Sequence, residues 1–271
     1  MSAKENTSRQ RTVAVIDVGT TSVRMAIAEI SPAGIIQILE HLSQAVNLGK
    51  DTFTRGRIDR DTIEECVQVL KSYQQILGEY GIQSSDDLRV VATSAVREST
   101  NRLAFLDRIY IATGIEIDPM DEAEISRITY LGIQAELERL GTSTDTVVCE
   151  VGGGSTELLL VRNGQIQFSH TYNLGSLRLR KAVDTYNAPI VQSRQLMESQ
   201  IRRTIDMFHE QMPVGQQRNL VALGGDIRFA ASQLLDDWSI IEGGVVSTDA
   251  LGEFTNDILK MSLDNIVRNY E

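Results

Sequence analysis

The sequence predicts an α/β protein built from two duplicated halves. A β-branched run at residues 12–16 leads into a glycine-containing loop and a second apolar run at residues 23–30. This order is typical of a strand, a tight loop and a further strand. The same pattern returns from residue 146, so that Glu150 follows Asp17 by 133 positions (150 − 17). With 271 residues and 42% hydrophobic side chains, the chain is long enough for two modest domains with buried cores.

The remaining elements alternate between helix and strand. Apolar residues at helical spacing over residues 61–80 predict an amphipathic helix that faces a core. Asn163 and Gly164 predict a tight hairpin turn between two strands. The other expected elements are strands at residues 35–39, 88–93, 114–117, 165–172 and 219–223, and helices at residues 101–108, 121–140, 193–212 and from residues 227 and 248.

The composition excludes several classes of protein. The chain carries 26 Lys and Arg against 37 Asp and Glu, a net charge of -11, which argues against a broad nucleic-acid surface. No apolar run approaches the ~18 residues of a membrane span, and the polar N-terminus lacks a signal sequence. Cys66 and Cys149 lie in apolar runs and are expected to be buried free thiols. We therefore expect a cytoplasmic protein without a membrane or nucleic-acid partner.

The two loops contain residues suited to phosphate binding. Glycine backbones present several N–H groups to an anion without side-chain bulk, and hydroxyl groups add further donors. The candidate phosphate-binding residues are Gly19, Thr20, Thr21 and Ser22 in the first loop, and Gly152, Gly153, Gly154, Ser155 and Thr156 in the second. A strand rather than a helix follows each loop, which distinguishes both from a dinucleotide-binding motif.

One acidic residue precedes each loop. Asp17 and Glu150 are expected on opposite walls of a cleft, where they would hold a divalent cation such as Mg²⁺, mostly through water. The alternative is that each carboxylate merely caps an ordinary hairpin turn. Arg97 follows a predicted strand, where a guanidinium could grip phosphate with two hydrogen bonds, or could instead be a solvated residue at the start of a helix.

These motifs and three others occur in an order that resembles the Ppx/GppA family of exopolyphosphatases and guanosine pentaphosphate phosphatases. The resemblance covers most of the chain, as far as Gly224 and Gly225. The motifs that carry it are residues 14–22, residues 92–97 with Asn101, residues 130–133, residues 150–157 and residues 175–179. The family has the actin-like fold, so the resemblance implies two ribonuclease-H-like domains that flank a cleft.

The resemblance also implies an activity. Water would attack the terminal phosphorus of polyphosphate or of a guanosine pentaphosphate with Mg²⁺ as cofactor. Asp17, Glu150 and Glu157 would order the metal ion and water, and Arg97 would grip phosphate. Polyphosphate or guanosine penta- or tetraphosphate is accordingly the expected partner.

The sequence departs from the family pattern at the predicted catalytic base. The family uses a glutamate in an acidic pair before an alanine. Counting back from Gly132 without a gap places this pair on Glu124 and Ile125. An alternative alignment uses Glu122, which Ala123 follows, and needs three extra residues. Glu122, Glu124 and Glu150 are therefore the candidate catalytic residues, and the helix start decides between the first two because one position rotates a side chain by about 100°.

Two other departures affect the expected activity. Glu150 and Asp226 stand where the family usually has Asp and Thr, and a negative charge at residue 226 should weaken polyanion binding. Three alternatives follow: an active phosphatase, a weakened or inactive member that binds polyphosphate or (p)ppGpp, and an ATP-using relative.

The expected organisation is a flexible tail at residues 1–11, an N-terminal domain at residues 12–141 and a C-terminal domain at residues 142–271. Family members continue past residue 271, so the second domain is expected to be less complete, which makes a homodimer plausible. The basic residues Arg178, Arg180 and Lys181 are either a rim for a long polyphosphate chain or a solvated helix face.

Overall fold

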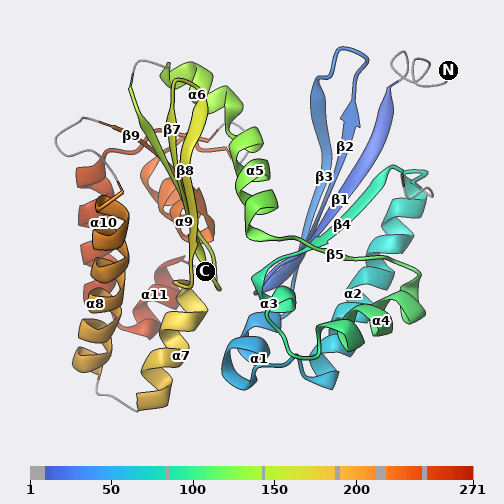
Figure 1. Ribbon diagram of the computed structural model, residues 1–271, viewed down its shortest axis with the longest axis horizontal. Coiled ribbons are helices and arrows are strands. Elements are labelled where there is room, and N and C mark those ends of the chain that lie inside the picture. Colours follow the sequence, from blue (N-terminus) through green and yellow to red (C-terminus); the bar gives the residue numbers. More distant parts are fainter. Residues whose placement is uncertain are drawn as a thin grey trace.

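A computed structural model describes residues 10–82, 86–141, 144–186, 190–211, 218–239 and 243–270. It shows a mixed α/β protein with two separate sheets, one from each half of the sequence (Figure 1). The predicted α/β class and its duplication are confirmed. Most of the predicted tail lies outside the described residues, but Arg11 already belongs to the first strand and forms a 2.6 Å ion pair with Asp87.

The first sheet has five strands in the order β3-β2-β1-β4-β5. Strands β1 and β2 are antiparallel, as are β2 and β3, whereas β4 and β5 run parallel to β1. The strands are β1 (Arg11–Val18), β2 (Ser22–Ile30), β3 (Ile36–Ala45), β4 (Leu88–Ala92) and β5 (Asp118–Pro119). The helices of this half are α1 (Leu48–Arg55), α2 (Arg60–Glu79), α3 (Ser94–Arg97) and α4 (Arg102–Thr113).

The core of the first half follows from strand and helix periodicity. Alternate β1 side chains Ala14, Ile16 and Val18 are buried against the predicted stripe of α2, which includes Cys66 and Leu70. Each fully buried aliphatic side chain contributes roughly 1.5–3 kcal/mol to folding. This core fixes the inner face of β1, so the intervening residues, including Asp17, face the other way.

The second sheet repeats this order with four described strands, β8-β7-β6-β9. Strand β7 is antiparallel to both β6 and β8, and β9 is parallel to β6. The strands are β6 (Thr146–Val151), β7 (Thr156–Arg162), β8 (Gln165–Tyr172) and β9 (Asn219–Gly224). The helices of this part are α7 (Ser176–Tyr186), α8 (Ile190–His209), α9 (Gly225–Leu234), α10 (Thr248–Lys260) and α11 (Leu263–Tyr270). Asn163 and Gly164 have positive φ angles of 52° and 68°, as the predicted hairpin turn requires.

The helix expected at residues 121–140 is two helices in the structure. Helix α5 (Glu122–Gly132) and helix α6 (Gln134–Leu140) meet at Ile133, next to a glycine that weakens helical continuity. Ile133 and Leu137 pack against Val148 and Leu159 of the second sheet. The predicted division after residue 141 therefore separates these helices from the sheet that they cover, and the domain limits stay a prediction.

The strand expected at residues 114–117 is also displaced. The structure has only Asp118–Pro119 in β5, paired with Val91 and Ala92 of β4. Ile115 and Ile117 are nevertheless buried in the first core, as apolar residues of an extended segment. In the part of the chain that is described, no helix has the length and apolarity needed to cross a bilayer.

Candidate active site

The first glycine loop is a tight turn between β1 and β2. The Gly19 N–H group donates a 3.0 Å hydrogen bond to the Ser22 carbonyl, which closes the loop. Asp17 on β1 lies directly opposite Arg24 on β2. Because opposite residues of an antiparallel pair project to the same face, the loop is flanked by one carboxylate and one guanidinium.

The second loop has the same geometry. The Gly152 N–H group donates a 2.9 Å hydrogen bond to the Ser155 carbonyl. Glu150 on β6 lies directly opposite Glu157 on β7. The second loop is thus flanked by two carboxylates, because a glutamate occupies the place that Arg24 has in the first half.

The two loops and the start of α3 meet. Thr20 Oγ1 lies 3.5 Å from Ser94 Oγ. A Cβ atom added to Gly153 would lie 3.0 Å from Thr20 Cγ2, and one added to Gly154 would overlap Ser94 Oγ. Glycine is therefore required at residue 154 by close approach of the first half, and the predicted phosphate-binding loops lie side by side.

The charge of Glu150 affects the pKa of the other two carboxyl groups next to the loops. Burial, the largest cause, raises the pKa of Asp17, and the charge of Glu150 adds to this effect while Arg24 opposes it. Burial and the Glu150 charge also raise the pKa of Glu157 to about 6, against a 2.6 Å hydrogen bond from Ser155 Oγ. We call Asp17, Glu150 and Glu157 the acidic cluster; Asp17 comes from the first half, and Glu150 and Glu157 come from the second.

Guanidinium groups surround this acidic cluster. The positive charge of Arg24 acts to lower the pKa of Asp17, and that of Arg97 acts to lower the pKa of Glu157. Burial, and then repulsion from Arg24, lower the pKa of Arg228, whereas Glu150 raises it. Arg228 lies in the first turns of α9. No short motif pointed to Arg228, because its approach to Arg24 and Glu150 depends on how distant segments pack; Arg24 is placed by its register opposite Asp17.

The start of α5 separates the two candidate glutamates. Glu122 Oε1 lies 3.9 Å from Arg97 Nη2. Glu124 instead lies 3.9 Å from Arg127, and its N–H group is capped by Asp121 Oδ1 at 2.8 Å. The structure thus brings Glu122 to Arg97, whereas the ion pair recorded for Glu124 is to Arg127.

Thr129 is a site residue that sequence reasoning missed. Its Oγ1 atom donates a 3.2 Å hydrogen bond to Glu150 Oε2. Ile125 precedes Thr129 by one helical turn and therefore lies on the same face of α5. The only signal in the sequence was the helical period of α5, and it could not show which sheet this face would contact.

Asp226 occupies the first turn of α9 and is exposed. A carboxylate at this place interacts favourably with the helix dipole. This local role gives a physical reason for an acidic residue where the family usually has threonine. Its predicted effect on polyanion binding stays a prediction.

The acidic cluster fits a hydrated Mg²⁺ ion better than one fully ligated by protein. Asp17 Oδ1 is buried and has no hydrogen-bond partner among the described residues. The described residues contain no group of three or more His, Cys, Asp or Glu side chains close enough to hold a metal ion together. Mg²⁺ commonly binds through one or two carboxylates and keeps several water molecules. The acidic cluster can supply the one or two carboxylates.

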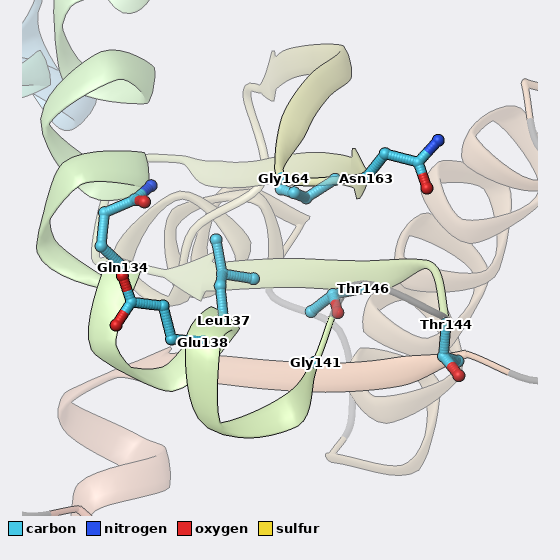
Figure 2. A pocket seen from close by; sticks show the side chains of 9 residues that line it. Gln134, Leu137, Glu138, Gly141, Thr144, Thr146, Asn163 and Gly164 are labelled. Carbon is cyan, nitrogen blue, oxygen red and sulfur yellow. The ribbon is translucent and has the colours of Figure 1, made fainter.

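A small pocket lies away from these residues. Figure 2 shows it between α6 and the turn that joins β7 and β8, where Leu137, Thr146 and Gly164 contribute to its lining. Its volume is about 70 Å³, and none of the predicted site residues lines it. Because its walls are mostly apolar and Glu138 is the one charged lining residue among those described, it is unsuited to a polyphosphate chain.

The fold and the paired loops define a two-lobed α/β protein of the actin-like class. The sequence profile of the Ppx/GppA phosphatase family matches residues 8–263. The chain belongs to the Ppx/GppA phosphatase family.

Individual relatives agree with this assignment. The chain is 30% identical over 171 residues to a bifunctional 3-dehydroquinate synthase/phosphatase of Fusobacterium nucleatum, a match that covers 61% of this chain and 25% of that protein. It is 26% identical over 221 residues to exopolyphosphatase 2 of Mycobacterium tuberculosis, covering 79% of this chain and 67% of that one. The crystal structure of an exopolyphosphatase-like protein superposes with a TM-score of 0.82 at 24% identity, covering 96% of this chain and 81% of that chain, and shows the shared fold.

The raised pKa of Glu157 predicts a pH-dependent stability. The pKa of the Glu157 carboxyl is about 6 in the folded protein, above its ordinary value of 4.5. Protonation of this group therefore stabilises the fold fully below pH 4.5, and this stabilisation is lost as the pH rises through 6. We expect the wild type to lose about 2 kcal/mol more stability between pH 4.5 and pH 7 than Glu157→Gln does. Urea denaturation at both pH values measures the difference, and equal pH slopes for the two proteins would contradict it.

Proposed function

We propose that the protein is a phosphohydrolase that removes the terminal phosphate from inorganic polyphosphate or guanosine pentaphosphate with Mg²⁺. The observation that carries the proposal is the meeting of two glycine loops beside Arg97 and the acidic cluster. The name of the Mycobacterium tuberculosis relative, exopolyphosphatase 2, supports polyphosphate. Both substrates end in the same phosphoanhydride, so one site serves either.

The binding step uses backbone groups and Arg97. The N–H groups of Gly19 and Gly152 close the loops, so the N–H groups of residues 20–22 and 153–156 donate to the oxygens of the terminal phosphate, and Arg97 neutralises its charge. Arg97 already donates a 3.0 Å hydrogen bond to the Met120 carbonyl, which fixes the side chain before the ligand binds. Such preorganised donors stabilise charge that develops in the transition state without a cost of reorganisation.

The chemical step needs a proton acceptor. Water attacks the terminal phosphorus, the bridging P–O bond breaks, and the shortened polyphosphate leaves. Glu122 takes the proton of the attacking water, because it is the candidate base that lies beside Arg97. Asp17 and Glu150 would hold a hydrated Mg²⁺ ion, which would supply charge neutralisation, and Thr129 orients the Glu150 carboxylate.

The two free thiols, Cys66 and Cys149, support a cytoplasmic location.

The choice of base predicts different results for two isosteric variants. Glu122→Gln is expected to lower the rate of phosphate release by roughly 10²-fold, because the amide cannot accept the proton. Glu124→Gln changes the same helix two residues away and is expected to retain the wild-type rate within about twofold. A colorimetric phosphate assay with polyphosphate, guanosine pentaphosphate and ATP measures both. Equal rates for Glu122→Gln and the wild type would rule out Glu122 as base.

The specific observation that favours a second candidate function is Ile125. In the ungapped alignment this apolar residue occupies the place of the family's catalytic glutamate. A weakened or inactive member would bind polyphosphate or (p)ppGpp as a sensor. The same assay distinguishes the two, since a sensor shows a thermal shift with polyphosphate and Mg²⁺ but releases no phosphate.

A further inference from the structure

The start of α7 holds the second glycine loop. Ser176 and Leu177 donate backbone hydrogen bonds of 3.1 Å and 2.9 Å to the carbonyls of Gly152 and Gly153. The conformation of the loop is therefore tied to the position of α7.

Arg178, one residue further along α7, contacts both halves of the molecule. Its Nε atom donates to the Gly154 carbonyl in the loop. Its Nη2 atom forms an ion pair with Glu98, just after α3. Its guanidinium carbon lies 4.2 Å from the ring centroid of Phe53 on α1. One planar side chain thus makes three different contacts, of which two reach the first half.

The surroundings of Arg178 are closely packed. A Cβ atom on Gly154 would come within 2.5 Å of Phe53 Cζ. Leu177 packs against the core of the first half, and Figure 1 shows α7 beside α1 where the two halves approach. The side chains of Arg178 and Glu98 are 22% and 32% exposed, so their ion pair is partly shielded from solvent and is stronger than a fully exposed one.

Neither sequence-based interpretation of the basic residues describes Arg178. Its Nε and Nη2 atoms are directed at Gly154 and Glu98 and its side chain is 22% exposed, so it is not a solvated residue on a helix face. A rim for a long polyphosphate chain needs donors directed at the ligand, whereas these two are directed at protein groups. What remains is a role in holding the loop.

We propose that Arg178 is a positioning residue that fixes the second glycine loop in its anion-binding conformation by joining it to the first half. The start of α7 holds the loop from within its own half, and Arg178 adds a link to the first half without which the loop is less ordered. The ligand class of the loop rests on the proposed function, but the ordering of the loop does not. Two testable properties follow. In the ligand-free protein the order of the loop depends on Arg178, and the affinity for phosphate depends on the order of the loop.

Amide hydrogen exchange of the ligand-free protein tests the first property. Arg178→Met removes the donors and keeps much of the aliphatic stem. We expect amide exchange at residues 152–155 to become about tenfold faster, because this factor corresponds to the loss of roughly one charge-assisted hydrogen bond. Arg178→Lys is expected to fall between the two, because an ammonium group cannot serve Gly154 and Glu98 in the planar geometry of a guanidinium. Arg194→Met, which removes an exposed ion pair to Glu198 within α8, is the matched control and leaves loop exchange unchanged.

Wild-type exchange at residues 152–155 in Arg178→Met would overturn the proposal, whether or not the protein hydrolyses polyphosphate. If Arg178→Met fails to fold, Glu98→Gln provides the test, because it weakens the ion pair between Arg178 and the first half and leaves the Phe53 contact intact. Faster loop exchange in this variant supports the proposal, and unchanged exchange overturns it. For the second property, calorimetry with inorganic triphosphate is expected to show about tenfold weaker binding by Arg178→Met. Faster exchange without binding of triphosphate by the wild type would contradict the proposed function alone.

Discussion

Arg97→Ala is expected to release phosphate from polyphosphate about 10³-fold more slowly than the wild type. This size is expected because Arg97 lies 3.9 Å from Glu122 and its charge acts on Glu157, and the proposed function places the transferred phosphoryl group beside it. Removal of one arginine from a phosphoryl-transfer site withdraws charge stabilisation that water does not replace. Initial rates over a range of polyphosphate concentrations measure the effect on kcat and KM.

A structural control accompanies this variant. Arg108→Ala removes an arginine that pairs with Glu64 between α4 and α2, at 2.7 Å. It leaves the loops untouched and is expected to retain the wild-type rate. If Arg97→Ala releases phosphate as fast as Arg108→Ala, phosphate is not held by Arg97 and the proposed site is wrong.

Gly154→Ala is expected to lower both activity and stability. The new methyl group overlaps Ser94 Oγ and Phe53 Cζ, so the Ser94 and Phe53 side chains or the second loop must move. Overpacking of this kind costs about 1–3 kcal/mol, and a displacement of about 1 Å at a reacting group lowers the rate by roughly 10²-fold. Thermal denaturation and the phosphate assay measure the two effects.

The same substitution elsewhere is expected to act in the opposite direction. Gly78 lies near the end of α2, and a Cβ atom added there meets nothing within 4 Å. Gly78→Ala therefore gains helix propensity, up to about 1 kcal/mol, and leaves activity unchanged. A Gly154→Ala protein that is as stable and active as Gly78→Ala would show that the two halves do not pack at this loop.

Local patterns in the sequence were sufficient for most elements of the fold. Strand alternation around Asp17 and Glu150, the α2 stripe and the turn at Asn163 depend on neighbours within a few residues, and the structure has each of them. The break at Ile133 and the packing of α5 on the second sheet depend on contacts far along the chain. The period of a single helix does not show which sheet that helix will cover.

The candidate site divides in the same way. The loop residues and Arg97 could be selected because chemistry and spacing coincide in short motifs. Thr129 and Arg228 could not, since each acts on a residue that the fold brings to it from another element. Arg178 was noted for its charge, but its contacts with Gly154 and Glu98 could not be predicted, for the same reason. The structure caps the start of α5 with Asp121 and brings Glu122 to Arg97, and which glutamate acts as the base stays a prediction.

The duplication of the two halves is broken at one pair of corresponding residues. Arg24 lies opposite Asp17 across the first loop, and Glu157 lies opposite Glu150 across the second. Two identical loops would offer an asymmetric ligand two equivalent orientations. A positive charge at one loop and a carboxyl with a raised pKa at the other make these orientations unequal in energy, so the paired loops have an electrostatic polarity.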